Sequence, residues 1–383
     1  MVHVTSYRLL SSILASQQAI KAFSFATTTT TTTMATSNIR GIVMVISPAK
    51  TLDLKRLSER EEMELDHDTI ASISSSAAAA AHTSLCDEDK TRTIVNIMKK
   101  KSEAELKTLL SLSPSLANTA HQYWQVFGLD SNKDKNKKKD DKDDAFAVFT
   151  FNGPAFQGIS AHTCNKSTMS YMSRNLFILD PVYGVLRSLD IMQPYRLEMG
   201  VKGIVANDTN NNHNKGKKET LASYWSSSVT SYLRNELNNN MKSSSSSPSS
   251  SLSILANLAS DEYSSSIDIA SLPANTIYLN VIFRHQGRVL AVHAKRARGL
   301  MARYLSQTNA QTLDDVASFN LENYFNTGEG ESKWEVTDVV GDNVQIMKMV
   351  FDRSEAPPKA GGKRTAAAAA TTKQGGKKSK KKK

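Results

Sequence analysis

Four internal segments of this chain are too polar and too repetitive to belong to a packed core. They are residues 74–84, rich in Ser and Ala, residues 130–144, in blocks of Lys and Asp, residues 207–218, rich in Asn and Lys, and residues 238–251, with Asn followed by Ser. Burying so few apolar side chains does not offset the conformational entropy that ordering would cost, so we expect mobile surface loops. The core must therefore form from the segments between them.

The two ends of the chain also differ from a packed domain. Residues 1–40 are rich in Ser, Thr and Ala and contain three basic and no acidic residues, which is typical of a mitochondrial or plastid transit peptide. A leader that an internal start at Met34 bypasses is the alternative. Residues 354–383 are predicted to be a disordered basic tail, which also resembles a nuclear-localisation or DNA-tethering patch. We therefore expect a location in an organelle, with the cytoplasm or the nucleus as the alternative.

The net charge of +11 comes from these two ends. Residues 356–383 contain ten Lys or Arg and no acidic residue, and residues 1–40 contribute three more positive charges. Residues 41–355 therefore carry a net charge of −2, so the folded part is not basic as a whole. Any anion-binding site on it must be a local patch of cations.

Cysteine, histidine and hydropathy patterns exclude several classes of protein. Two cysteines, Cys86 and Cys164, are too few for a disulfide-framed secreted protein. The acidic neighbours of Cys86 are expected to raise its pKa, which disfavours a redox-sensing thiolate. None of the eight histidines has Cys or carboxylate partners at zinc spacing, so we predict neither a metal site nor a cofactor. The chain has no apolar run long enough to span a membrane, so we expect no membrane partner.

Apolar periodicity predicts an α+β or mixed α/β protein with a single core domain over residues 41–353, in which helices surround a mixed sheet. Strands are expected at residues 42–46, 146–151, 176–179, 254–258, 277–283, 289–293 and 344–351. Helices are expected at residues 91–110, 115–127, 220–237, 295–306 and 313–318. Gly287 is expected to form a β-hairpin turn that leads into the helix 295–306.

Polar side chains follow four of the predicted strands. In chain order they are Ser47 and Lys50, then Asn152, then Asp180, then Asp261 and Glu262. If these strands are parallel in one sheet, the side chains meet at its carboxyl edge, where α/β proteins bind ligands. Such a pocket could use Lys50 as an electrophile or nucleophile and Asp261 or Glu262 as a general acid or base. A structural polar network is the alternative.

The strongest electrostatic feature is a run of six basic residues, with no acidic one, between Arg284 and Arg303. A packed helix from Lys295 onwards would hold arginines in place for bidentate binding of phosphate. The alternative is a solvated face, or ion pairs with acidic residues elsewhere. We predict that this segment binds anions.

A second candidate anion site begins at Asp180 and Pro181. The pair resembles a helix N-cap followed by proline at the first helical position, so a helix is predicted over the residues up to Arg187. Backbone amides at such a helix start can hold a phosphate.

Four blocks of sequence, taken in order, resemble the YaaA family of peroxide-stress proteins. They are residues 46–53 (ISPAKTLD), 183–200 (YGVLRSLDIMQPYRLEMG), 257–263 (NLASDEY) and 294–303 (AKRARGLMAR). The resemblance covers residues 41–353 apart from the inserts. It implies a protein that binds DNA and limits oxidative damage, with a helix-hairpin-helix-like element at the second block. Gly184 is kept there, whereas Pro181 replaces an earlier glycine of the family.

The resemblance and the basic run together predict which residues contact DNA. They are Pro181, Tyr183, Gly184, Arg187, Arg196, Lys295, Arg296, Arg298 and Arg303, in a basic cleft between the second block and the helix of the fourth. The expected partner is duplex or irregular DNA, bound by its phosphates without reading of sequence. The family is linked to lowering free iron, but this chain shows no iron ligands, so such an effect would be indirect.

We therefore interpret the chain as a DNA-binding protein rather than an enzyme. The alternative is an enzyme that acts on a nucleotide, a base or another phosphorylated ligand at the strand ends, through Lys50, Asp261 and Glu262. A scaffold whose inserts and tail contact other proteins is a third interpretation.

Overall fold

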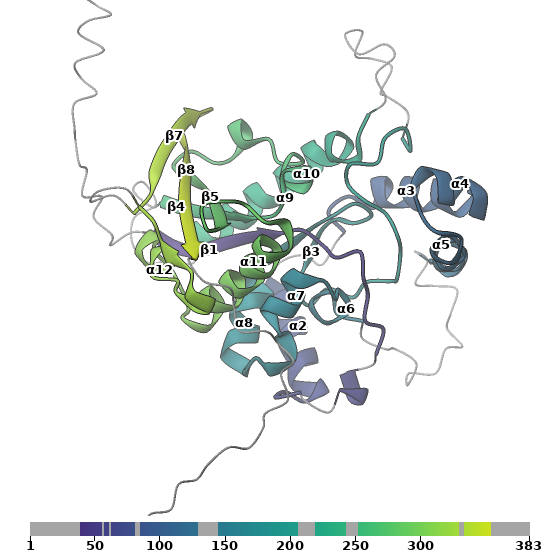
Figure 1. Cartoon of the computed structure of the whole chain (residues 1–383), viewed down its shortest axis with the longest axis horizontal. Helices are drawn as coiled ribbons and strands as arrows, with labels where there is room; N and C mark the ends of the chain where they lie inside the picture. Colours follow the sequence, from purple (N-terminus) through teal and green to yellow (C-terminus); the bar gives the residue numbers. More distant parts are fainter. Residues whose placement is uncertain are drawn as a thin grey trace, which may run out of the picture.

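The computed structural model describes residues 39–55, 57–60, 63–80, 85–128, 145–205, 219–242, 252–328 and 333–353. Within this part of the chain, eleven α-helices and one eight-stranded mixed sheet share a single core (Figure 1), which confirms the predicted mixed α/β class. The strands are β1 (Ile39–Ile46), β2 (Leu176–Asp180), β3 (Gly184–Arg187), β4 (Leu252–Leu258), β5 (Thr276–His285), β6 (Phe325–Asn326), β7 (Glu335–Val340) and β8 (Val344–Arg353). The helices are α2 (His67–Ala80), α3 (Glu88–Lys99), α4 (Glu103–Leu109), α5 (Pro114–Val126), α6 (Ala147–Thr150), α7 (Pro154–Ile159), α8 (Lys166–Asn175), α9 (Leu221–Lys242), α10 (Asp261–Ser264), α11 (Ala291–Gln307) and α12 (Leu313–Ala317).

The sheet has the strand order β3-β2-β1-β4-β5-β8-β6, and β7 also pairs with β8. Strands β2, β1, β4, β5 and β8 are parallel, whereas β3, β6 and β7 are antiparallel to their neighbours. In β1, residues 42–46 are buried on both faces, as expected for a central parallel strand. The loops that follow β1 and β4 therefore leave the sheet at the same edge.

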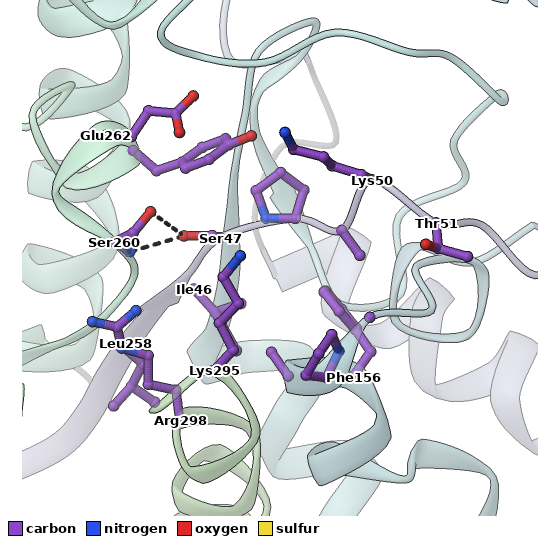
Figure 2. A pocket seen from close by; sticks show the side chains of 16 residues that line it. Ile46, Ser47, Lys50, Thr51, Phe156, Leu258, Ser260, Glu262, Lys295 and Arg298 are labelled. Atoms are coloured by element: carbon purple, nitrogen blue, oxygen red, sulfur yellow. Dashed lines mark hydrogen bonds between the residues drawn. The ribbon is translucent and has the colours of Figure 1, made fainter. Parts of the chain in front are cut away.

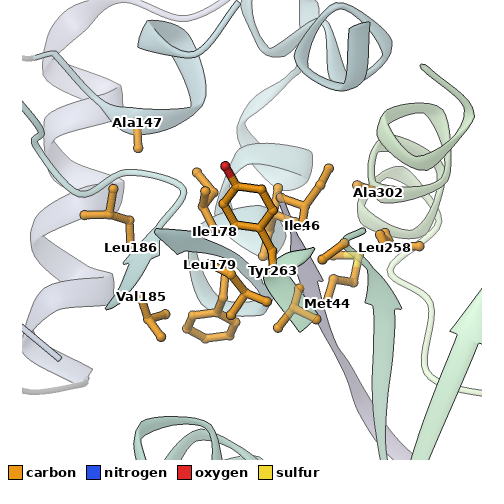
Figure 3. Packing of buried hydrophobic residues seen from close by; sticks show 14 of the residues in the cluster. Met44, Ile46, Ala147, Ile178, Leu179, Val185, Leu186, Leu258, Tyr263 and Ala302 are labelled. Carbon is orange, nitrogen blue, oxygen red and sulfur yellow. The ribbon is translucent and has the colours of Figure 1, made fainter. Parts of the chain in front are cut away.

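Helices cover both faces of this sheet. Helix α9 contacts β1, β3 and β4, whereas α8 and α11 pack against the sheet from the other side (Figure 1). Buried side chains such as Met44, Ile46, Ile178 and Leu258 fill the space around the central strands (Figure 3). Helices α3, α4 and α5 lie to one side of the sheet in the same view.

No helix in the described part of the chain has both the length and the apolar composition needed to cross a bilayer.

Two glycines allow α7 and α11 to pack with their backbones almost in contact. A Cβ atom added at Gly299 would lie 1.7 Å from the carbonyl oxygen of Ala155. One added at Gly158 would lie 2.4 Å from the carbonyl oxygen of Arg296. Because no side chain fits at this crossing, α7 fixes the position of the basic helix α11.

The helix predicted after Asp180 is wrong, because this segment is the turn of the β2–β3 hairpin. The Asp180 side chain accepts hydrogen bonds from the backbone N–H groups of Val182 and Tyr183, at 2.8 and 2.9 Å. The same interaction caps a helix or closes a turn, so it does not distinguish the two. Gly184 then takes a φ of +74°, which starts the return strand instead of a helix.

Several other boundaries differ from the predictions. Residues 146–151, predicted as a strand, contain the short helix α6, and residues 289–293 run into α11. The predicted helix 91–110 is two helices, because Ser102 caps a new one with Glu105. Residues 74–80 and 238–242, predicted as loops, extend α2 and α9. The other predictions for the inserts, the leader and the tail concern residues outside the described part of the chain. These are residues 1–38, 81–84, 130–144, 207–218, 243–251 and 354–383.

Candidate functional site

A cavity of about 220 Å³, here called the strand-end pocket, lies at the carboxyl ends of β1 and β4 (Figure 2). The loop after β1, the starts of α7 and α10, and the first turns of α11 form its walls. Its polar lining comes from Ser47, Lys50, Ser260, Glu262, Lys295 and Arg298. The prediction that parallel strand ends would bring Ser47, Lys50 and Glu262 together is consistent with this arrangement.

Hydrogen bonds between two serines join the loops that follow β1 and β4. The backbone N–H of Ser260 donates to Ser47 Oγ at 2.9 Å, and the two hydroxyl oxygens are 3.3 Å apart (Figure 2). Ile46 and Leu258, which precede this contact, are paired in the parallel register of the strands. The strand pairing therefore brings both hydroxyls to the same wall of the pocket.

Residues 196–200 hold the rim of the pocket in place. Lys50 Nζ forms an ion pair with Glu198 at 2.7 Å, and the Lys50 carbonyl accepts a hydrogen bond from Arg196 at 2.9 Å. Glu262 Oε1 accepts from the backbone N–H of Gly200 at 2.8 Å. Lys50 and Arg196 therefore help to hold the rim of the pocket in place.

Two cations in the pocket are not neutralised. Lys295 and Arg298 lie one turn apart on α11, and neither forms an ion pair within the described part of the chain. Arg298 is half-buried, and its buried Nε has no hydrogen-bond partner. Burial lowers the pKa of Arg298, and the charge of Asp261 partly opposes this effect. The guanidinium nevertheless stays charged at neutral pH, so the pocket contains a cation without an ion-pair partner among the described residues.

Three of the predicted pocket residues do not line it. Asp180 is fully buried and accepts hydrogen bonds from the turn and from the Tyr195 hydroxyl, so it is a structural group. Asn152 faces a separate shallow depression next to Asp53, because residues 146–151 do not form the expected strand. Asp261 is exposed beside the pocket.

Replacing Asp180 by Asn should remove a pH dependence of stability between about pH 4 and pH 6. Burial raises the pKa of Asp180 to about 6, against the opposing hydrogen bonds from Tyr195, Tyr183 and Val182. An unfolded Asp has a pKa of about 4, so this group stabilises the fold fully below about pH 4. Its contribution is lost as the pH rises through about 6. Urea unfolding of both proteins from pH 4 to 8 measures this, and parallel pH profiles would contradict it.

The structure does not bring the second block and α11 together as an open basic cleft. Pro181, Tyr183, Gly184 and Arg187 are all buried. The Arg187 guanidinium forms an ion pair with Glu236 at 2.6 Å, with only 6% of its side chain exposed. Arg187 is therefore a paired residue of the core, an arrangement that does not favour contact with a phosphate.

Two of the four basic residues of α11 are also committed to other groups. Arg303 donates to the carbonyls of Ile159, Ser160 and Thr163 and to the Thr163 hydroxyl, at 2.7 to 3.0 Å. It therefore closes the turn after α7 and is engaged there, while its expected role in binding phosphate stays a prediction. Arg296 forms an ion pair with Glu322 at 2.7 Å, with 41% of its side chain exposed.

Sequence reasoning missed the apolar walls of the pocket. Pro48, Pro154, Phe156 and the buried Tyr263 line it beside the charged groups. The sequence features that could have indicated these walls were Pro154, which begins α7, and Tyr263, which directly follows Glu262.

The direction predicted for the pKa of Cys86 is confirmed, since burial and then Asp87 raise the pKa of its thiol to about 12. No cluster of His, Cys, Asp or Glu among the described residues could hold a metal ion.

The sequence of this chain matches the model of a known protein family. Residues 42–328 match the family described as "Peroxide stress protein YaaA". The chain belongs to this family. The matched range includes every residue that lines the strand-end pocket, so the pocket is part of the region shared with YaaA proteins.

Its relatives include bacterial proteins named "UPF0246 protein". One from Francisella philomiragia subsp. philomiragia is 31% identical over 285 residues, which is 74% of this chain and 94% of the relative. One from Marinomonas sp. (strain MWYL1) is 30% identical over 282 residues, covering 73% of this chain and 90% of the relative. A third, from Flavobacterium johnsoniae, is 30% identical over 283 residues, 73% of this chain and 93% of the relative.

Proposed function

We propose that this member of the YaaA family acts in the peroxide-stress response by binding DNA through its phosphates, without reading sequence. The observation that carries the proposal is the surface at the start of α11. Arg288 and Lys295 are exposed there, and neither forms an ion pair with a described residue. Exposed, unpaired cations on a folded element are available to replace the counterions of a phosphate backbone.

The turn before α11 is a rigid projection. Gln286 and Gly287 have φ values of +50° and +75°, and His285 and Arg288 exchange backbone hydrogen bonds across them. Gly287 N–H also donates to Asp352 Oδ2 at 2.8 Å, which attaches the turn to β8. A preorganised cation loses less conformational entropy on binding phosphate than one on a mobile segment.

Exposed apolar side chains lie between these cations. Val289 is 59% exposed and Val292 is 66% exposed. Proteins that bind DNA without base-specific contacts often place apolar residues against the grooves beside their cations. The combination of exposed apolar and basic residues therefore supports the proposed DNA surface. Lys295 extends this surface to the mouth of the strand-end pocket.

Replacing Arg288 and Lys295 together by Ala should weaken DNA binding and lower its salt dependence. Each lost phosphate contact reduces the slope of log K against log salt by about one. The measurement is fluorescence anisotropy with a labelled duplex, in protein that lacks residues 354–383. The ten basic residues of that tail would otherwise contribute phosphate contacts of their own.

A matched control replaces Lys333 and Lys348, which form ion pairs with Asp314 and Glu335. This control variant loses the same formal charge from a surface that includes β8. Its DNA affinity should therefore fall much less than that of the Arg288/Lys295 variant. Equal losses in the two double variants would show that only net charge matters. A folded Arg288/Lys295 variant with the parental affinity and salt slope would refute the proposed surface.

A further inference from the structure

The strand-end pocket is not explained by binding of duplex DNA. Its volume of about 220 Å³ is enclosed by four segments of the chain and is below the range of about 300 to 1,000 Å³ for pockets that hold drug-sized ligands. A duplex therefore cannot enter it, whereas one small molecule can. The pocket needs a ligand of its own, and the argument for that ligand does not depend on DNA binding.

Arg298 indicates the charge of this ligand. Its guanidinium is half-buried in the pocket wall, has no ion-pair partner among the described residues, and leaves a buried Nε without a hydrogen bond. A desolvated cation without a partner is costly, and an anion that accepts several of its N–H donors would offset that cost. Lys295 lines the same wall one helical turn away and can supply a second positive charge (Figure 2).

The other lining groups indicate that the anion has an organic part. The hydroxyls of Ser47 and Ser260 can exchange hydrogen bonds with sugar hydroxyls or phosphate oxygens. Pro48 and Phe156 form an apolar wall in the same cavity. Glu262 adds one negative charge, which disfavours a second anionic group and can accept hydrogen bonds from hydroxyls.

We propose that the strand-end pocket binds a small phosphomonoester, no larger than one nucleotide, whose phosphate is held by Arg298 and Lys295. The ester's organic part contacts Ser47, Ser260 and the wall that contains Phe156. Carboxyl ends of parallel strands are the usual ligand-binding edge of α/β sheets, and the unpaired guanidinium supplies the anion selectivity here.

The test uses the full chain and isothermal titration at physiological salt with four probes: ribose 5-phosphate, adenosine 5′-monophosphate, inorganic phosphate and ribose. Wild-type protein should bind one or both phosphomonoesters at least about tenfold more tightly than inorganic phosphate, and ribose should not bind. Arg298→Gln and Lys295→Gln should each weaken phosphomonoester binding by about tenfold or more. Lys348→Gln, which removes one charge elsewhere, should leave it unchanged.

Three results would overturn the proposal. They are no binding of either phosphomonoester, equal affinity for inorganic phosphate, and phosphomonoester binding that survives both pocket substitutions. Lys295 is exposed, so its variant keeps the test valid if Arg298→Gln does not fold. Loss of phosphomonoester binding in Arg298→Gln with DNA affinity retained would support the pocket and separate it from the DNA surface. Failure of the Arg288/Lys295 test alone would leave the pocket proposal intact.

Discussion

Replacing Arg187 by Ala should lower the free energy of unfolding by about 3 to 5 kcal/mol, as expected when one partner of a buried ion pair is removed. The Arg187 and Glu236 side chains are only 6% and 13% exposed, and their charged atoms are 2.6 Å apart. Removing the guanidinium leaves the Glu236 carboxylate desolvated and unpaired. Chemical denaturation at pH 7 measures the loss. This result would establish Arg187 as a structural residue.

Two further variants make this prediction specific. Replacing Arg187 and Glu236 together by Leu should recover much of the lost stability, because no buried charge then remains. Lys333→Ala breaks the ion pair with Asp314, whose side chains are 55% and 45% exposed, and should cost less than about 1 kcal/mol. If Arg187→Ala were as mild as Lys333→Ala, the pair would be solvated and Arg187 would again be a candidate for phosphate binding.

Replacing Gly299 by Ala should destabilise the protein by about 3 kcal/mol, at the upper end of the usual cost of overpacking. The added Cβ would lie 1.7 Å from the Ala155 carbonyl oxygen, so α7 and α11 would have to move apart. Both helices line the strand-end pocket, and the variant should therefore also weaken any ligand that binds there. Thermal and urea unfolding measure the change in stability.

Gly128→Ala is the matched control for this glycine. No atom lies within 4 Å of a Cβ added at Gly128, so its stability should change by less than about 0.5 kcal/mol. A Gly299→Ala protein as stable as Gly128→Ala would mean that the two helices do not pack with their backbones in contact. The position of Arg298 in the pocket wall would then need to be revised.

The central strands could be predicted because their burial requires apolar side chains at successive or alternate positions of the sequence. Apolar patterns identified β1, β4, β5 and β8 to within a few residues. A parallel strand covered on both faces, such as β1, needs apolar side chains throughout, and β8 is buried mainly at alternate positions. Residues 146–151 are equally apolar but form α6, because a short buried run has no periodicity that distinguishes a strand from a helical turn. This misassignment is why Asn152 was grouped with the strand-end residues, although it lines a different depression.

Local sequence was enough to predict that Ser47, Lys50 and Glu262 follow strands, and that a cation-rich helix follows Gly287. Both conclusions depend on patterns within a few residues. Which of the cations lack an ion-pair partner depends on how the chain folds. Arg187 pairs with a carboxylate 49 residues away, and Arg303 with carbonyls more than 140 residues away. Such contacts form when distant segments pack, so local sequence does not show that Arg298 is left unpaired in the pocket.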